Sequence, residues 1–177
     1  MVNKRVRTPV LLALFTSVMC ITSFIAIPLF GIPITLQSFG VTMALFMLGG
    51  ARATVSVFTY VVIGVIGLPV FSGFGGGIGV LLGPTGGFII GFLAMALVYW
   101  LLTAFFGKLR LCRIIGCVVG HITMYLIGSL WYFIFYGGGA GYFEILIITV
   151  APFIIPDAVK AMLAYFVSKK LNKFIRL

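Results

Sequence analysis

The feature of this sequence that most constrains the fold is a succession of long apolar runs without a charged side chain. Residues 8–30 form the first such run, and a helix of about 20 apolar residues is long enough to cross the roughly 30 Å hydrocarbon layer of a membrane. The whole chain is 63% hydrophobic and 8% charged, whereas soluble domains carry about 25% charged residues. A soluble globular protein is therefore excluded.

The apolar runs predict an all-α fold, an integral membrane bundle of six transmembrane helices. Turn-forming or charged residues separate the runs, notably Gly31-Ile32-Pro33, Arg52 and the three glycines at 137–139. We expect the first run to be retained rather than cleaved as a signal peptide, because it is longer than the usual apolar core of such peptides. The chain is expected to form a single membrane domain, residues 1–177, with helices over residues 8–30, 38–51, 53–68, 84–107, 114–136 and 145–168.

The basic residues predict the orientation of this bundle, since Lys and Arg concentrate in cytoplasmic segments. Eleven of the twelve lie in residues 1–7, at Arg52, in residues 108–113 or in the tail after residue 168. The three connecting segments expected on the other side contain none. Both termini are therefore predicted to be cytoplasmic, and a loop over residues 73–87, in which eight of fifteen residues are glycine, is predicted to lie outside.

The residues that the chain lacks make catalysis and metal binding improbable. Glu144 and Asp157 are its only carboxylates, so a site built on paired carboxylates would need both. The three cysteines form no C-x-x-C motif and no cluster with histidine. His121 lies inside the fifth predicted helix, where we expect a hydrogen bond to another helix. No catalytic residue and no metal ligand is predicted.

Two opposite charges inside the sixth predicted helix are the first candidates for ligand binding. Asp157 and Lys160 are three residues apart and so share one helix face. A charge at that depth costs at least about 2.5–3.5 kcal/mol on insertion scales, and such residues usually face a cavity or a partner. Pro152 and Pro156 interrupt the backbone beside them, as in the broken helices of membrane binding sites. The alternative is an ion pair that only holds helices together.

The outer loops supply further candidates. Glycine allows a backbone to approach a small ligand closely, and the glycine-rich loop contains no Walker lysine and no G-x-G-x-x-G motif, so nucleotide binding is not expected. The alternative for the glycine-rich loop is a tightly packed loop that binds no ligand. The alternative for the side-chain amide of Gln37 is a solvated position in the loop. The candidate side chains in and beside these loops are Thr35, Gln37, Phe71, Ser72, Phe74, Thr85 and Tyr142.

Four motifs together resemble the BioY family, the biotin-specific S components of energy-coupling factor (ECF) transporters. They are GIPITLQ at 31–37, GLPVFSGF at 67–74, Gly79 followed by GPTGGF at 83–88, and Pro156-Asp157-x-x-Lys160. The likeness covers nearly the whole chain. It implies a six-helix, multi-pass protein of the bacterial cytoplasmic membrane that captures biotin at the outer side and uses no cofactor. It adds Gly73, Gly79 and Gly86 to the candidate biotin-binding residues.

The resemblance also implies roles for particular segments and partners. S components associate with a transmembrane coupling subunit and two ABC ATPases, and this chain has no Walker motif of its own. Small residues on the first helix contact the coupling subunit in the family. Ala13 and Ser17 match that pattern, with serine in place of the more usual second alanine; their alternative role is internal packing. The loop at residues 31–38 corresponds to the family's lid.

Biotin offers a carboxylate, a ureido ring and an apolar thiophane. We expect Lys160 to pair with the carboxylate; alternatively, Asp157 accepts from the ureido N–H groups while Lys160 neutralises Asp157. Another vitamin's S component, for riboflavin or thiamine, stays open. An intramembrane enzyme would need a nucleophile with a base or a metal, and a channel would need a polar stripe along several helices. Beyond biotin and the ECF subunits, the expected partner is membrane lipid and not nucleic acid.

Overall fold

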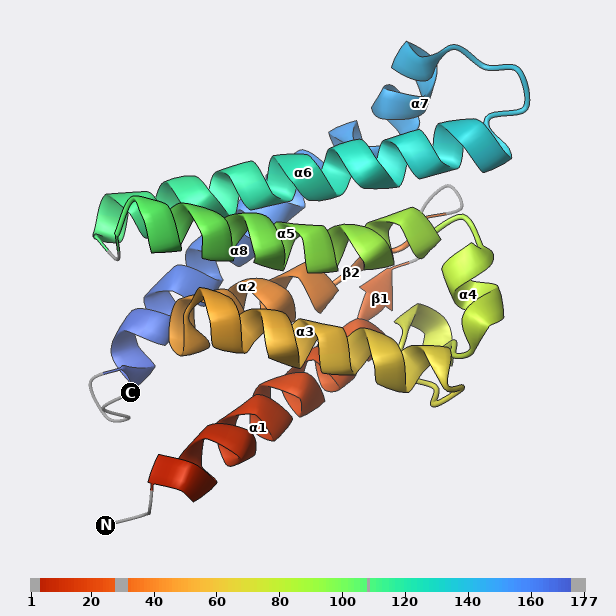
Figure 1. Cartoon of the computed structure of the whole chain (residues 1–177). Coiled ribbons are helices and arrows are strands. Elements are labelled where there is room, and N and C mark those ends of the chain that lie inside the picture. Colours follow the sequence, from red (N-terminus) through yellow and green to blue (C-terminus); the bar gives the residue numbers. More distant parts are fainter. Residues whose placement is uncertain (1–3, 28–31, 108, 173–177) are drawn as a thin grey trace.

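The computed structural model describes residues 4–27, 32–107 and 109–172. The chain is helical over most of its length (Figure 1). The elements in chain order are α1 (Lys4–Phe24), β1 (Ala26–Ile27), β2 (Ile34–Thr35), α2 (Gln37–Leu48), α3 (Gly50–Val65), the 3-10 turn η1 (Ser72–Phe74), α4 (Ile78–Leu82), α5 (Gly86–Phe105), α6 (Arg110–Tyr136), α7 (Tyr142–Thr149) and α8 (Ala151–Leu171).

Four helices, α1, α5, α6 and α8, are long and apolar enough to cross a membrane, and α2 and α3 are apolar but shorter. The prediction of an all-α membrane protein is thereby confirmed. α3 follows α2 after the single residue Gly49, whose φ of 78° lies in the left-handed region. Glycine adopts this conformation without the steric cost of a Cβ. The two short helices therefore form a tight helical hairpin.

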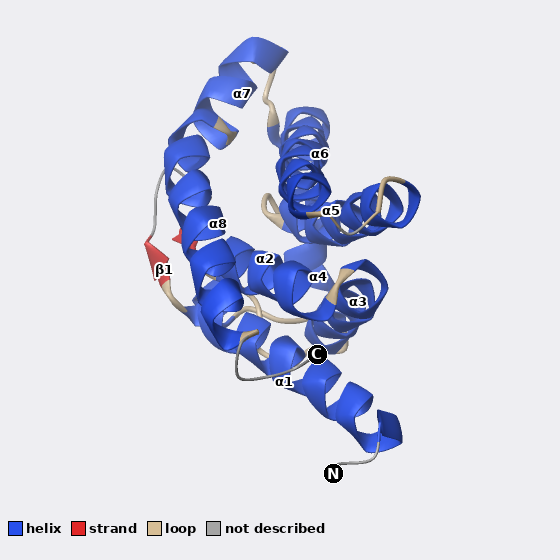
Figure 2. Ribbon diagram, turned by 90° about the vertical axis from the view of Figure 1, so that its left-hand side faces the viewer, coloured by secondary structure: helices blue, strands red, loops and turns tan. Residues whose placement is uncertain are grey.

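The short helix α2 lies at the centre of the bundle (Figure 2). It contacts α1, α3, α5, α6 and α8, and all of its residues except Phe39 and Met43 are buried. A helix that is apolar on every side is expected to be surrounded by other elements. Because α2 is central, the polar side chains in its first turn, Gln37 and Ser38, face the interior of the protein.

The longest helix pair, α5 and α6, is packed through glycine. A Cβ at Gly87 would lie 2.3 Å from the Cβ of Trp131, and one at Gly91 would lie 3.0 Å from the carbonyl oxygen of Met124. Small residues allow helices to approach closely in lipid, where packing drives association. This close contact fixes the positions of the side chains that α5 and α6 direct toward α2 and α8.

The two ends of the bundle carry different segments (Figure 1). The start of α1, the turn between α2 and α3, the connection between α5 and α6, and the end of α8 lie at one end. The β1–β2 hairpin, α4 and the connection from α6 to α7 lie toward the other. The basic segments and the glycine-rich loop are thus separated by the length of the helices.

The helix bounds differ from the predicted ones mainly in three places. The break between the second and third predicted helices lies at Gly49 and not at Arg52, which is inside α3. The run predicted to be helical over residues 8–30 leaves the helix at Phe24 and enters β1, where Ala26 pairs with Thr35; residues 28–30 lie outside the described part of the chain. The run predicted over 145–168 forms two helices, since the backbone of Val150 leaves the helical region and α8 restarts with Pro152 in its first turn, where proline is tolerated.

The loop over residues 73–87 contains more regular structure than its glycine content predicts. The turn η1 overlaps the start of this loop at Gly73 and Phe74, and the five residues of α4 form a short helix inside it. Gly86 begins α5, and a Cβ there would lie 1.6 Å from the carbonyl oxygen of Leu81. Glycine is required at this position because the backbone of α4 passes directly over it.

Candidate functional site

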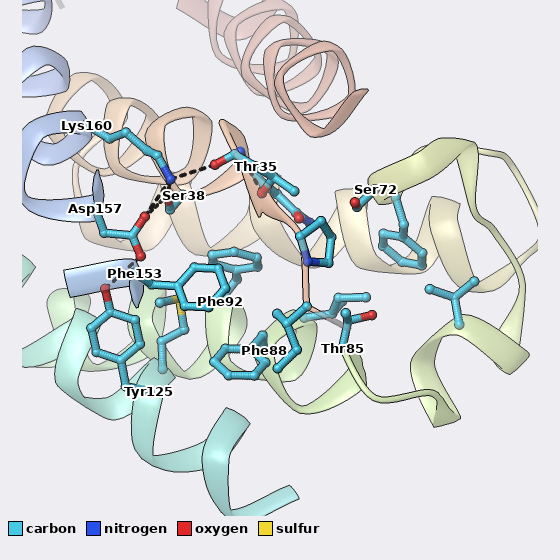
Figure 3. Close-up of a pocket in the computed structure, with 17 residues that line it drawn as sticks. Thr35, Ser38, Ser72, Thr85, Phe88, Phe92, Tyr125, Phe153, Asp157 and Lys160 are labelled. Atoms are coloured by element: carbon cyan, nitrogen blue, oxygen red, sulfur yellow. Dashed lines mark hydrogen bonds and ion pairs between the residues drawn. The ribbon is translucent and has the colours of Figure 1, made fainter. Parts of the chain in front are cut away.

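A pocket lies among α2, α5, α6 and α8, beneath the loops that precede α2 and α5 (Figure 3). Its free volume is about 70 Å³. An apolar pocket with a few convergent polar groups is the usual form of a small-ligand site. The apolar lining consists of Ile32, Pro33, Phe71, Val80, Phe88, Ile89, Phe92, Met124 and Phe153, and the polar lining of Thr35, Gln37, Ser38, Ser72, Thr85, Tyr125, Asp157 and Lys160.

A buried ion pair forms one wall of this pocket. Lys160 Nζ lies 2.7 Å from Asp157 Oδ1, and the two residues are 7% and 5% exposed. Ser38 Oγ donates to the same oxygen at 2.7 Å, and the Tyr125 hydroxyl donates to Oδ2 at 2.7 Å. Lys160 also donates to the Thr35 carbonyl oxygen at 2.7 Å and to Ser38 Oγ at 3.3 Å. Both carboxylate oxygens and all three ammonium protons therefore have partners, as a buried pair requires.

Three regions far apart in the sequence assemble this network: α8, α6, and the adjacent β2 and start of α2 (Figure 3). Asp157 and Lys160 share one face of α8, as their spacing predicted. Ser38 comes from the first turn of α2, Tyr125 from the middle of α6, and the carbonyl of Thr35 from β2. The ion pair thus connects the centre of the bundle to the loop between α1 and α2.

A second hydrogen-bond chain reaches from the pocket toward the glycine-rich loop. Gln37 Nε2 donates to the Tyr60 hydroxyl oxygen at 2.6 Å, and that hydroxyl donates to the Val70 carbonyl oxygen at 3.0 Å. Ser23 Oγ on α1 donates to the same carbonyl. Gln37 is 5% exposed, so the alternative of a solvated loop glutamine is wrong. Its amide is fixed by α3 at the edge of the pocket.

Phe71 reaches the pocket because a glycine makes room for its ring. The ring is 1% exposed and packs edge-on against the ring of Tyr60. A Cβ at Gly64 on α3 would lie 2.1 Å from the Phe71 ring. The start of the glycine-rich segment is therefore held against α3 and supplies one apolar wall.

The structure brings seven of the twelve sequence-predicted ligand-binding residues to the pocket. These are Thr35, Gln37, Phe71, Ser72, Thr85, Asp157 and Lys160. Gly31 of the predicted lid lies outside the described residues, whereas Ile32 and Pro33 of the same motif line the pocket.

The other five, Gly73, Phe74, Gly79, Gly86 and Tyr142, do not line the pocket. Phe74 is 66% exposed and stacks on Phe24 of α1, with ring centroids 4.5 Å apart. The Tyr142 hydroxyl lies 3.0 Å from Ser129 Oγ, so it joins α7 to α6. These aromatic residues serve packing between elements in this conformation.

Sequence reasoning missed the residues that complete the polar network and the aromatic walls. Ser38 was within one residue of a candidate, but an uncharged serine in an apolar run gives no signal of its own. Tyr125 is one of several aromatic residues in the fifth apolar run, and only the structure distinguishes it. Of the missed apolar side chains, Phe88, Ile89 and Phe92 come from α5 and Phe153 comes from α8.

His121 does not make the expected hydrogen bond to another helix. Its Nδ1 lies 2.9 Å from the carbonyl oxygen of Cys117 in the same helix, so Nδ1 carries the proton. Its Nε2 is buried and has no partner among the described residues. Within the same part of the chain, no group of three or more His, Cys, Asp or Glu residues is placed to hold a metal.

The buried pair leads to a prediction about the ligand-free protein. Lys160→Met leaves the Asp157 carboxylate buried without a counter-charge, so it should destabilise the fold by about 3–5 kcal/mol. The double variant Asp157→Leu with Lys160→Met removes both charges and should recover most of that loss. Thermal unfolding in detergent measures both changes, with Lys170→Met at the exposed end of α8 as the control. A Lys160→Met protein as stable as the parent would contradict the ion pair.

Comparison with protein families finds a match to the BioY family over residues 1–177. The chain is 36% identical over 162 residues to the probable biotin transporter BioY of Pyrococcus horikoshii, covering 92% of this chain and 94% of that protein. It is 35% identical over 179 residues to the biotin transporter BioY of Rhodobacter capsulatus, covering 95% of this chain and 94% of that protein.

Two solved structures share the fold. The S-component for biotin from an ECF-type ABC transporter superposes with a TM-score of 0.83 at 28% identity, covering 98% of this chain and 94% of that chain. The S component of a bacterial ECF transporter superposes with a TM-score of 0.67, covering 97% of this chain and 98% of that chain. The identity to the second is 13%, so that likeness shows the fold alone.

Proposed function

The chain belongs to the BioY family, and we propose that it transports biotin as the substrate-binding S component of an ECF-type ABC transporter. The observation that carries this proposal is an apolar pocket, with a satisfied charge pair in its wall, in a chain that resembles biotin transporters over more than nine tenths of its length. The protein is a multi-pass membrane subunit that binds a substrate, and it is not an enzyme.

The chemistry of the pocket suits the parts of biotin. Phe88, Phe92 and Phe153 provide apolar surface for the thiophane ring and the alkyl chain. Asp157 Oδ2 accepts one hydrogen bond, from Tyr125, and an ionised carboxylate oxygen has capacity for a second. All three ammonium protons of Lys160 are already donated. This geometry favours the arrangement in which Asp157 accepts from the ureido N–H groups and Lys160 neutralises Asp157.

We extend the proposal to the topology. All six of the helices α1, α2, α3, α5, α6 and α8 are taken as spans, the two short ones ending inside the membrane on the pocket side. The described basic residues other than Lys160 lie toward the opposite end of the bundle, at the start of α1, near the turns and at the end of α8. The positive-inside rule then puts both termini in the cytoplasm. The pocket faces the outer side, from which biotin is captured.

Entry of biotin requires movement of the loop before α2. The free volume of about 70 Å³ has room for about five waters on the scale of one water per 10–15 Å³, which is less than biotin occupies. Ile32, Pro33 and Thr35 cover one side of this space, and the Thr35 carbonyl is held by Lys160. We assign residues 31–38 as a lid that opens outward for the ligand.

The partners complete the transport cycle. As an S component the chain acts with other subunits, and we assign these as a transmembrane coupling subunit and two ABC ATPases. Ala13 and Ser17 are exposed on α1, and Ser17 Oγ donates to the Ala13 carbonyl oxygen of its own helix. The surface that these small residues form permits close approach of a partner helix.

Biotin binding should depend strongly on Lys160. Lys160→Ala should weaken binding by about 2–5 kcal/mol, as is typical when one member of a buried charge pair is truncated. Equilibrium dialysis with labelled biotin measures the loss, and Lys170→Ala is the control. Unchanged affinity in a folded Lys160→Ala protein would rule out the site. Parallel dialysis with riboflavin and thiamine tests whether the chain binds another vitamin instead. If Asp157 accepts hydrogen bonds from the ureido ring, biotin amide should bind about as well as biotin.

The lid should be visible in backbone hydrogen exchange. Saturating biotin should slow exchange at residues 31–38, because closure protects amides that open locally in the free protein. Without biotin, Lys160→Ala should speed exchange in the same segment, since the bond to the Thr35 carbonyl is lost. Exchange measured by mass spectrometry checks both, with the α5–α6 contact as the internal reference. Equal exchange with and without biotin would show a fixed wall.

Enlarging the α1 surface should separate binding from transport. Ala13→Trp or Ser17→Trp should leave biotin binding by the isolated protein intact and sharply reduce ATP-dependent uptake by the reconstituted complex, because the bulky ring blocks close helix contact. Val118→Trp, at a position that is 53% exposed on α6, is the matched control. Loss of both activities would indicate internal packing, and loss of neither would place the coupling contact on another helix.

A further inference from the structure

A second cavity opens at the end of the bundle opposite the biotin pocket. It lies where α2 turns into α3 and where α5 meets α6, with a volume of about 850 Å³. A smaller depression of about 250 Å³ adjoins it and shares Phe46, Arg113 and Asn172 with it. These two cavities, called the basic cavity below, are far larger than the free volume of the biotin pocket. Neither contains any residue of that pocket.

Four basic residues line the basic cavity: Arg52, Arg110, Arg113 and Lys169. The only two carboxylate side chains in the sequence are elsewhere. Asp157 is paired with Lys160, and Glu144 accepts from the Gly141 amide at the start of α7. No acidic side chain of this chain can therefore neutralise the basic cavity. The positive charge of the basic cavity therefore suits an anion from outside the protein.

Arg113 is fixed in an orientation suited to anion binding. Its Nε donates to the Tyr99 hydroxyl at 3.2 Å, and an Nη donates to the Phe46 carbonyl oxygen near the end of α2. The guanidinium also lies over the Phe46 ring, 5.7 Å from its centroid. A guanidinium has five N–H donors, so donors remain for a ligand. A guanidinium held in place matches the geometry of a phosphate and loses little entropy on binding it.

The walls of the basic cavity are amphipathic. Trp100 is 42% exposed at its edge, and tryptophan is enriched where a membrane protein meets the lipid headgroups. The helices α3 and α5 also carry exposed apolar side chains, among them Phe58 and Leu101. A ligand that combines an anionic head with apolar chains would use both kinds of surface.

We propose that the basic cavity binds the phosphate headgroup of an anionic phospholipid, with its acyl chains along α3 and α5. Basic pockets between transmembrane helices on the cytoplasmic side bind such headgroups, and the proposal rests on the orientation given above. Arg113 holds the phosphate from the floor of the cavity. Arg52 and Lys169 approach it from the rim, from α3 and α8.

Two neighbouring lysines on α8 provide a matched test. Lys169 lines the basic cavity and Lys170 does not, although both are exposed. Lys169→Gln and Arg52→Gln should each weaken binding of phosphatidylglycerol to the purified protein about fivefold, the effect of one basic residue at a charged membrane surface. Lys170→Gln should not. Native mass spectrometry measures bound phosphatidylglycerol against phosphatidylcholine. Arg113 is left intact because it holds the end of α2.

The outcomes separate the possible anions. Retention of phosphatidylglycerol in millimolar inorganic phosphate supports a lipid site, and displacement by phosphate alone overturns it. Equal losses in Lys169→Gln and Lys170→Gln would show unspecific attraction and also overturn it. A third outcome would also overturn it: the protein binds no lipid, and the Arg52→Gln protein loses its partner subunits. That outcome would indicate that the basic cavity binds an acidic surface of a partner. Biotin binding should be unchanged in all three variants, so the proposed function is tested separately.

Discussion

A buried ion pair determines how this bundle is assembled. A lysine and an aspartate in the middle of an apolar helix are tolerated only if nearly every proton and lone pair finds a partner. Asp157 and Lys160 supply one bond to each other, and the remaining partners come from α2, α6 and β2. The polar network thus requires three other segments to converge on α8. The pocket lies beside the point where these segments meet α8.

The shortness of α2 gives the pocket its depth. Twelve residues span about 18 Å at 1.5 Å per residue, against a hydrocarbon layer of about 30 Å. A central helix of that length cannot fill the bundle from one side to the other. Its first turn, with Gln37 and Ser38, ends inside the protein. The loops before α2 and after α3 cover the space that it leaves, so their conformation controls access.

The sequence predicted the parts of this arrangement that depend on rare residues. Asp157 and Lys160 could be identified because opposite charges in an apolar run are rare. A charge inside the membrane is energetically costly and usually faces a cavity or a partner. Ser38 and Tyr125 escaped detection because a serine and a tyrosine are common in membrane helices and gain meaning only from their distance to Asp157. Gly86 and Phe74 were predicted to bind the ligand. In the structure Gly86 packs against Leu81 and Phe74 stacks on Phe24, so both serve packing.

The charge balance of the pocket also bears on how biotin is oriented in it. Asp157 and Lys160 neutralise each other, and Lys160 is the one cation among the described lining residues. A biotin carboxylate placed deep in the pocket would bring a negative charge with no free counter-charge, at a high desolvation cost. The neutral ureido ring carries no such cost and can donate to Asp157 Oδ2. Under the proposed function, this charge balance favours biotin with its ring system against α8 and its carboxylate toward the proposed lid.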